Sequence, residues 1–508
     1  MPPGIEADVS VATQAVPADP LQTAALVVTP TVTTRRGTPE NVLRRALIAW
    51  LLAPVWLASP PASAQAAPKL GQPARPTVAR ADPVPLAVFA DVIGGDESKA
   101  LAALARIGDN WRESSAALLI EMIPRIPSRR ALRGCIALIE KVSGRPFDGS
   151  VEPWYEWLWS AERPVHPDYA QFKALLYTPI DSRFGEYFTG RPKSIIRLDE
   201  IRWGGVRRDG IPPLKNPKMI TARQASWLSD DDIVFGVAIN GDIRAYPKRI
   251  LAWHEMFKDR IGGRELAGVY CTLCGALVLY DVTVNGVQHE LGTSGFLYRS
   301  NKLMYDHATK SLWSTLTGTP VVGPLVNQGI ELKLLYVVTT TWKEWRRRHP
   351  ETQVLSLDTG YRRDYDEGVA YREYFATDRL MFGVPARDDR LPNKAEVLAL
   401  RGAQAPGEAL AVAADFLASH PVYHDRIGGV NIVVLTDPSG ANRVYESNGV
   451  TFLSWDNVDA VRDSRGVSWK MDESALTAPT GGSLKRLPAH RAFWFGWHAA
   501  FPATRLVK

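Results

Sequence analysis

The chain has 508 residues, of which 45% are hydrophobic and 22% are charged, the ordinary composition of a soluble globular protein. Its net charge of +6 is small for this length, and the basic triplet Arg346–Arg348 lies in a Trp-rich helical pattern, so we exclude a nucleic-acid partner. A chain this long exceeds one hydrophobic core, so we expect about two to three domains.

Residues 44–64 have the features of a secretory signal peptide. Two arginines precede an apolar run of about 13 residues, and a small-residue cleavage site of the A-x-A type comes after it. The run is well short of the roughly 20 residues that span a bilayer, which favours a cleaved signal over a permanent anchor. We therefore expect a periplasmic or secreted protein with peripheral or no membrane association. Residues 1–43, rich in Pro, Thr, Ala and Val, are expected to be a disordered extension or to follow a mis-assigned start, and residues 65–85 an Ala/Pro linker.

Apolar residues recur at helical spacing over residues 86–163, with breaks at Gly108 and at Pro127. This pattern predicts three short amphipathic helices in a small α-helical domain that resembles a HEAT-type unit. Cys135 falls within the third helix, where we expect a buried structural thiol. An aromatic cluster at residues 154–159 is expected to pack this domain against the next part of the chain.

The pattern becomes strand-like from Ile233 onward. Apolar residues alternate up to Asn240 and Gly241, a two-residue hairpin signal, and a second Asn-Gly pair stands at 285 and 286. A helical pattern returns at residues 341–349, and residues 359–394, charged and rich in tyrosine, are expected to connect two domains. These elements predict an α+β protein, with a small N-terminal helical domain followed by β-rich domains.

An internal repeat organises the β-rich part. Residues 251–263 reappear as residues 417–429 at a constant offset of 166, both segments beginning Leu-Ala-x-His and ending Asp-Arg-Ile-Gly-Gly. A pair of tryptophans nearer the C-terminus recurs at an offset of 152, as expected for a second copy with shortened loops. We predict two copies of one β-rich domain, over residues 196–358 and 395–508, of which the second is degenerate.

Two of the three cysteines, Cys271 and Cys274, occupy the turn that is predicted between two apolar strands. At the offset of 166 residues the second copy carries Asp437 and Gly440 instead. The turn therefore folds without cysteines, and the two thiols of the first copy require a separate explanation.

Three uses of these cysteines remain open. In the first, Cys271 attacks and Cys274 resolves in thiol–disulfide exchange with a protein thiol or other redox partner, because the two-residue spacing lets the sulfurs pair and separate again. In the second, both thiolates bind copper or zinc together with His254 or Met304. In the third, a permanent disulfide rigidifies the turn, although closing so short a loop removes little entropy from the unfolded chain. A non-enzymatic interaction scaffold is a further alternative.

Four further residues are assigned to the site as supporting groups: His254, Ser294, Arg299 and Asp306. Ser294 and Arg299 lie in stretches of the first copy that have weak or absent counterparts in the second. Arg299 and His254 are also among the neighbours that could activate a thiol. His254 has the counterpart His420 in a copy without cysteines, which favours a hydrogen-bonded scaffold role for it.

Several motifs occur together in the first copy: Asn240 to Pro247, Trp253-His254-Glu255, Tyr270 to Gly275, Thr293-Ser294-Gly295, Leu303 to Asp306, and Val322-Gly323-Pro324. Together they resemble a bacterial family catalogued as domain of unknown function 3179, and the resemblance extends from Ile201 to the C-terminus. The activity of that family is not established, so the resemblance implies the domain rather than a reaction. Some members are described as candidate selenoproteins with selenocysteine at a motif cysteine, which implies redox use of Cys271 and Cys274. This chain has threonine between the cysteines where members often have proline.

Overall fold

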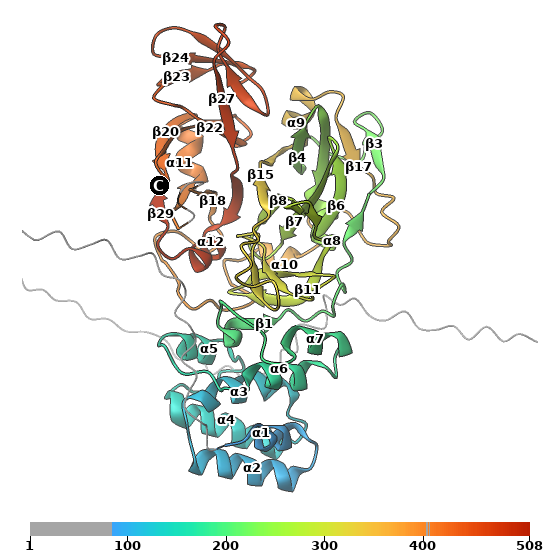
Figure 1. Cartoon of the computed structure of the whole chain (residues 1–508), viewed down its shortest axis with the longest axis vertical. Coiled ribbons are helices and arrows are strands. Elements are labelled where there is room, and N and C mark those ends of the chain that lie inside the picture. The colour runs from blue at the N-terminus through green and yellow to red at the C-terminus, as the bar shows by residue number, and fades with distance from the viewer. Residues whose placement is uncertain (1–83, 403–404, 406) are drawn as a thin grey trace, which may run out of the picture. The chain divides into compact units, whose positions relative to one another are not determined.

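The computed structural model describes residues 84–508, apart from 403–404 and 406. A helical region at residues 86–188 is followed by several β-sheets, which confirms the α+β class predicted from the sequence (Figure 1). The predicted extension, the signal peptide and most of the linker lie outside the described residues. Within the described range, no helix has the length and apolar character needed to cross a membrane.

The helical region begins with five α-helices over residues 86–159, where the sequence predicted three. They are α1 (Leu86–Ile93), α2 (Glu97–Asp109), α3 (Ser114–Met122), α4 (Arg129–Ser143) and α5 (Glu152–Trp159). Asp96 and Ser128 start α2 and α4, because each side chain accepts a hydrogen bond from the backbone N–H three residues further on. Two more helices, α6 (Tyr169–Tyr177) and α7 (Gly185–Phe188), extend this region beyond residue 163.

The core of the helical region contains one thiol and one ion pair that are both buried. Cys135 is fully buried in α4, and burial raises the pKa of its thiol to about 12, which fits the predicted structural role. Lys173 Nζ lies 2.5 Å from the Glu121 carboxylate and 2.6 Å from the Ile201 carbonyl oxygen. The Tyr177 hydroxyl donates to the same carboxylate at 2.6 Å. These contacts join α3 and α6 to the first strand, and they leave neither buried charge without a partner.

A five-stranded sheet packs against the helices, with the strand order β1-β11-β12-β13-β14. Its strands are β1 (Ile201–Trp203), β11 (Leu291–Tyr298), β12 (Asn301–Asp306), β13 (Leu312–Ser314) and β14 (Pro320–Val322). Phe296 and Leu303 belong to the same apolar core as the helices. Between β11 and β12, Arg299 and Ser300 have φ values of 50° and 61°, as a tight two-residue hairpin turn requires.

Two further five-stranded sheets complete the first repeat, in the orders β16-β4-β5-β17-β3 and β15-β8-β7-β6-β2. Their strands are β2 (Leu214–Lys215), β3 (Met219–Thr221), β4 (Ile233–Ile239), β5 (Asp242–Pro247), β6 (Met256–Ile261), β7 (Arg264–Cys271), β8 (Ala276–Asp281), β15 (Lys333–Leu335), β16 (Val338–Thr341) and β17 (Gln353–Leu355). Helix α8 (Lys248–His254) connects β5 to β6, and α9 (Trp342–Arg348) connects β16 to β17. The two predicted Asn-Gly turns are both present, one between β4 and β5 and one between β9 (Thr283–Val284) and β10 (Val287–Gln288).

The second repeat contains a four-stranded sheet, β28-β18-β19-β29, and an eight-stranded sheet, β20-β21-β22-β27-β26-β25-β24-β23. Its strands are β18 (Glu396–Arg401), β19 (Ala409–Ala413), β20 (Val422–Ile427), β21 (Val430–Thr436), β22 (Asn442–Glu446), β23 (Phe452–Trp455), β24 (Ala460–Asp463), β25 (Ser468–Met471), β26 (Ala475–Thr477), β27 (Ser483–Leu487), β28 (His490–Phe493) and β29 (Arg505–Val507). The helices are α11 (Ala414–Ser419) and α12 (Trp494–Ala500), and the preceding connection contains the short α10 (Arg372–Phe375).

The two repeats share one local topology. The hairpin β4–β5 is flanked by antiparallel β16 and parallel β17, and the hairpin β18–β19 by antiparallel β28 and parallel β29. In each repeat a short helix then leads into the next hairpin. The indole N–H of Trp345 donates to Thr352 Oγ1 at 3.0 Å, and that of Trp497 donates to Thr504 Oγ1 at 3.0 Å. The tryptophans that recur at an offset of 152 residues therefore make the same contact in both repeats.

Candidate functional site

The two cysteines lie on the turn of the β7–β8 hairpin, as the sequence predicted. Cys271 is the last residue of β7 and pairs across the ladder with Ala276, the first residue of β8. Two backbone hydrogen bonds close the turn, from the N–H of Cys274 to the carbonyl of Cys271 at 3.1 Å and from that of Gly275 to Thr272 at 3.3 Å. Gly275 has a φ of +60°, which glycine adopts without strain.

The turn brings the two sulfur atoms together as free thiols. The Cys271 and Cys274 Sγ atoms are 2.8 Å apart. The residues are only 2% and 1% exposed, so solvent does not reach the pair in this conformation. The two sulfurs therefore lie side by side inside the protein, close enough to become joined as a disulfide when an oxidant accepts two electrons.

The β11–β12 turn covers the sulfurs on one side. The Ser300 carbonyl oxygen lies 3.3 Å from Cys274 Sγ and 3.9 Å from Cys271 Sγ. Asn301 Oδ1 lies 2.9 Å from Cys274 Sγ, and the Asn301 amide donates to the Gly496 carbonyl at 3.1 Å. Asn301 Oδ1, held in place by the second repeat, is therefore a second acceptor beside Cys271 for the single proton of the Cys274 thiol.

The environment shifts the pKa values of the two thiols in opposite directions. Burial acts against the Cys271 thiolate, but hydrogen bonds from the Cys274 thiol and from the Lys302 backbone N–H outweigh it and lower the pKa of Cys271. Burial raises the pKa of Cys274 well above its ordinary value, and the hydrogen bond and negative charge of Cys271 add to the rise. Of the two thiols, Cys271 is thus the more readily deprotonated, and Cys274 holds its proton more firmly.

A buried carboxylate organises the other side of the turn. Glu255 accepts hydrogen bonds from the Thr272 hydroxyl at 3.0 Å and from the Tyr371 hydroxyl at 2.9 Å. Lys302 Nζ forms an ion pair with the same carboxylate at 2.9 Å. The backbone carbonyl of Glu255 also accepts from the Tyr270 N–H at 2.9 Å. The Glu255 side chain therefore ties the cysteine turn to the connection between the repeats and to β12.

The second repeat and the connection before it supply the rest of the cover. The backbone N–H of Phe493, in the second repeat, donates to the Cys274 carbonyl at 2.7 Å, and the Tyr374 hydroxyl, in the connection, donates to the Leu273 carbonyl at 2.7 Å. The corresponding turn of the second repeat contacts the first repeat in the same way, because Ser439 Oγ in this turn lies 3.2 Å from Thr340 Oγ1 in β16. Each repeat thus places its hairpin turn against the strand that precedes the last helix of the other repeat, β28 for the first turn and β16 for the second.

Of the four supporting residues, only Arg299 belongs to a segment that covers the sulfurs. Its guanidinium pairs with Glu200 at 2.5 Å and donates to the Ala499 carbonyl at 3.0 Å, so it fastens the β11–β12 turn and contacts no sulfur. Ser294 donates within the sheet, to the Leu303 carbonyl at 2.6 Å. Asp306 pairs with His289 at 3.2 Å and accepts from the Thr309 N–H at 2.7 Å, both away from the cysteines.

The structure does not bring His254 to the two cysteines, as the metal interpretation with His254 requires. His254 Nδ1 lies 2.9 Å from the Pro212 carbonyl and Nε2 lies 2.6 Å from the Tyr365 hydroxyl, so both ring nitrogens are engaged away from the sulfurs. Met304 is buried in the same apolar core as the cysteines. Over the described residues, no group of three or more His, Cys, Asp or Glu side chains could hold a metal ion. Two thiolates bonded to one tetrahedral zinc ion at about 2.3 Å would also lie about 3.8 Å apart, farther than these sulfurs.

Several residues that contact the turn were not assigned to the site from the sequence, among them Glu255, Asn301 and Gly496. The internal repeat could have indicated Glu255. Its counterpart in the second copy, 166 residues later, is Pro421, so the carboxylate occurs only in the copy that has cysteines. Asn301 and Gly496 contact Cys274 although both are distant from it in the sequence, Asn301 by 27 residues and Gly496 by many more. No local pattern indicates such contacts.

Comparisons with known proteins agree with the resemblance found in the sequence. No curated protein and no solved structure matches the chain. The model of one family, described as "Protein of unknown function (DUF3179)", matches residues 208–504, which is more than half of the chain and covers most of both repeats. The protein therefore belongs to the DUF3179 family.

Proposed function

We propose that Cys271 and Cys274 form a redox pair that exchanges between dithiol and disulfide with a partner thiol or disulfide. The observation that carries this proposal is the distance of 2.8 Å between two free sulfurs whose pKa values are shifted in opposite directions. A thiolate beside a protonated thiol is the arrangement that the attacking and resolving cysteines need.

The exchange has two steps. In the first, the Cys271 thiolate attacks one sulfur of a partner disulfide, a bond forms between Cys271 and that sulfur, and the other partner sulfur leaves as a thiolate. In the second, Cys274 gives up its proton and attacks Cys271 Sγ, which releases the remaining partner thiolate. Two electrons pass to the partner, whose disulfide becomes two thiols, while Cys271 and Cys274 become one disulfide. The reverse sequence oxidises the partner.

Burial of the pair sets a condition on this chemistry. A partner sulfur reaches Cys271 only when part of the cover, formed by the β11–β12 turn and by Phe493 and α12, moves aside. Such covers open locally at a fraction of the free energy of global unfolding. A pair of this kind would act in an oxidising compartment, which fits the periplasmic or secreted location expected from residues 44–64.

The test is a redox titration of the purified protein. Wild type is equilibrated with glutathione buffers poised over about −320 to −120 mV, quenched with acid, alkylated and analysed by mass spectrometry. We expect one reversible two-electron transition that joins Cys271 to Cys274. A Cys135→Ala background should titrate identically, since Cys135 is buried elsewhere.

Single variants then identify the attacking residue. With a small disulfide probe, Cys274→Ala should retain a mixed disulfide on Cys271, whereas Cys271→Ala should not accumulate one on Cys274. A pair that stays reduced, or stays oxidised, at every potential would overturn the proposal. Stoichiometric copper or zinc that is lost from Cys271→Ser would replace it with the metal-binding alternative.

A further inference from the structure

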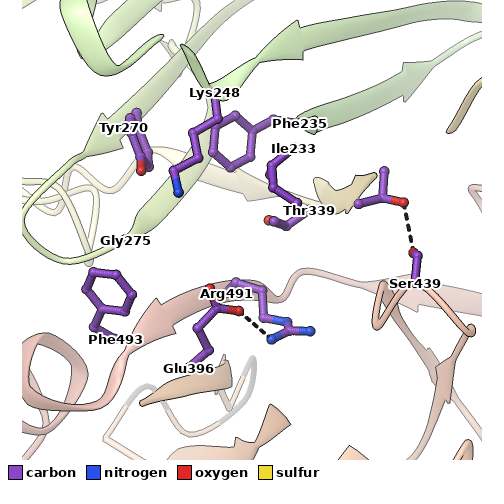
Figure 2. A pocket seen from close by; sticks show the side chains of 11 residues that line it. Ile233, Phe235, Lys248, Tyr270, Gly275, Thr339, Glu396, Ser439, Arg491 and Phe493 are labelled. Atoms are coloured by element: carbon purple, nitrogen blue, oxygen red, sulfur yellow. Dashed lines mark hydrogen bonds and ion pairs between the residues drawn. The ribbon is translucent and has the colours of Figure 1, made fainter. Parts of the chain in front are cut away.

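A small cleft opens between the two repeats beside the cysteine turn. Its open volume is about 90 Å³. Its lining residues come from both repeats: Ile233, Phe235, Lys248, Tyr270, Gly275, Thr339, Thr340, Glu396, Ser439, Arg491 and Phe493. Figure 2 shows the side chains of the first repeat on one side of the cleft and those of the second repeat facing them.

The cleft lies against the residues that flank the cysteines. Tyr270 directly precedes Cys271, and Gly275 directly follows Cys274. The Phe493 ring rests on Gly275 so closely that a Cβ built at Gly275 would lie 2.9 Å from ring carbons. Phe493 also donates its backbone N–H to the Cys274 carbonyl, so one residue contacts both the cleft and the cysteine turn.

The two cations of the cleft differ in their partners among the described residues: Arg491 has a carboxylate partner and Lys248 has none. Arg491 pairs with Glu396 at 2.7 Å, and it also donates to Asn442 Oδ1 at 2.9 Å and to the Gly440 carbonyl at 2.6 Å. Lys248 projects into the cleft from the start of α8 (Figure 2). No carboxylate of the described residues lies within ion-pair distance of its ammonium group, which lies over the face of the Phe375 ring, 4.8 Å from the centroid.

We propose that this cleft binds the carboxylate of a low-molecular-weight disulfide, through the Lys248 ammonium, and so holds the substrate disulfide beside the cysteine turn. This inference rests on the proposed redox function. Three features support it: an ammonium without a carboxylate partner faces the cleft, the partly exposed ring of Phe493 gives the cleft an apolar wall, and the cleft adjoins the cysteine turn. The counterpart of Lys248 in the second repeat is Ala414, so the cation occurs only beside the cysteines.

In this arrangement the bound disulfide is reduced by the pair. The Phe493 ring moves off Gly275, the Cys271 thiolate forms a bond with the nearer sulfur of the ligand, and the farther sulfur leaves as a thiolate. Cys274 loses its proton and displaces the second ligand thiolate, so one ligand disulfide becomes two carboxylate-bearing thiols and Cys271–Cys274 becomes a disulfide. A thiol reductant of the same chemical class, in excess, reverses the reaction.

The test compares two disulfides of opposite charge on the reduced full-length protein. 3,3′-Dithiodipropionate carries two carboxylates, and cystamine carries two ammonium groups. For each probe we measure the rate at which it forms the Cys271–Cys274 disulfide. This rate is divided by the rate at which the same probe oxidises free 2-mercaptoethanol, which corrects for differences in intrinsic reactivity between the probes. We expect wild type to prefer dithiodipropionate by about fivefold or more, the size of one partly screened ion pair.

Substitutions at Lys248 should change this preference and nothing else. Lys248→Gln should abolish it, and Lys248→Glu should invert it in favour of cystamine. Lys343→Gln, at an exposed lysine on α9, is the matched control and should keep the wild-type ratio. If both probes oxidise the pair but the ratio is the same in wild type and both Lys248 variants, the carboxylate site is refuted and the redox function stands. If neither probe oxidises the pair in any variant, the redox function itself fails.

Discussion

Gly496 in α12 and Cys274 in the first repeat are in direct contact, with less than ordinary van der Waals space for a side chain between them. A Cβ built at Gly496 would lie 3.1 Å from Cys274 Cβ and 3.3 Å from its sulfur. The second repeat has no cysteines, yet its last helix fits closely over the pair in the first repeat. The second repeat thus supplies part of the enclosure of the site.

This contact predicts the effect of one added methyl group. Gly496→Ala forces α12 or the cysteine turn to shift, so it should lower the free energy of unfolding by about 1–3 kcal/mol, as overpacking of a tight core does. Chemical denaturation with fluorescence detection measures the change.

Gly108→Ala is the matched control, because Gly108 is also helical but has open space. A Cβ there would meet only Leu138 Cδ1, at 3.7 Å. We expect it to be neutral or to stabilise the protein by up to about 1 kcal/mol, since alanine favours the helix. Equal effects at both positions would refute the close fit at Cys274.

The hydrogen bond between the cysteines predicts how Cys271 titrates. Cys274→Ser keeps a donor beside the Cys271 thiolate, whereas Cys274→Ala removes it, so the pKa of Cys271 should be higher in the alanine variant. The ultraviolet absorbance of the thiolate, followed against pH, gives the value in each variant. Identical titration curves would mean that Cys274 does not stabilise the thiolate.

Much of the architecture could be predicted because local patterns determine it. The Asn-Gly turns at 240 and 285 require positive φ at both positions, which few residues other than Asn and Gly adopt, so they identified two hairpins. The repeated tryptophans were recognisable because both copies keep the same indole hydrogen bond. The number of N-terminal helices was underestimated, because short helices separated by brief turns give few periods of the apolar pattern.

The surroundings of the cysteines were harder to predict. The hairpin position of Cys271 and Cys274 follows from the strands on either side, which pair locally. Their cover comes from Asn301, from Phe493 and from Gly496, and these contacts depend on how the repeats pack on each other. Sequence alone therefore located the thiols but not the groups that cover them.

The buried histidine at position 254 predicts a loss of stability in acid. Burial lowers the pKa of His254 from 6.5 to about 4, with the hydrogen bond to Pro212 acting in the opposite direction. The unfolded chain therefore takes up this proton first as the pH falls, and stability should be lost between pH 6.5 and about 4, by about 1–3 kcal/mol.

His254→Gln should reduce that slope. His490, whose pKa burial also lowers to about 4, contributes with the same sign, so the double variant with His490→Gln should show the shallowest dependence. Denaturation at a series of pH values measures these slopes. Wild type and His254→Gln with parallel curves would show that His254 is not held neutral in the folded protein.

The recurring Trp–Thr hydrogen bond allows the cover over the cysteines to be tested against an internal control. Thr504→Val and Thr352→Val each leave a buried indole N–H without its acceptor, so each should destabilise the protein by about 1–3 kcal/mol. Only Trp497 lies in α12, the helix packed on Cys274. Alkylation of the reduced pair should therefore accelerate in Thr504→Val and stay close to the wild-type rate in Thr352→Val. If both variants label equally fast, α12 does not control access, and the pair becomes reachable only when the whole domain unfolds.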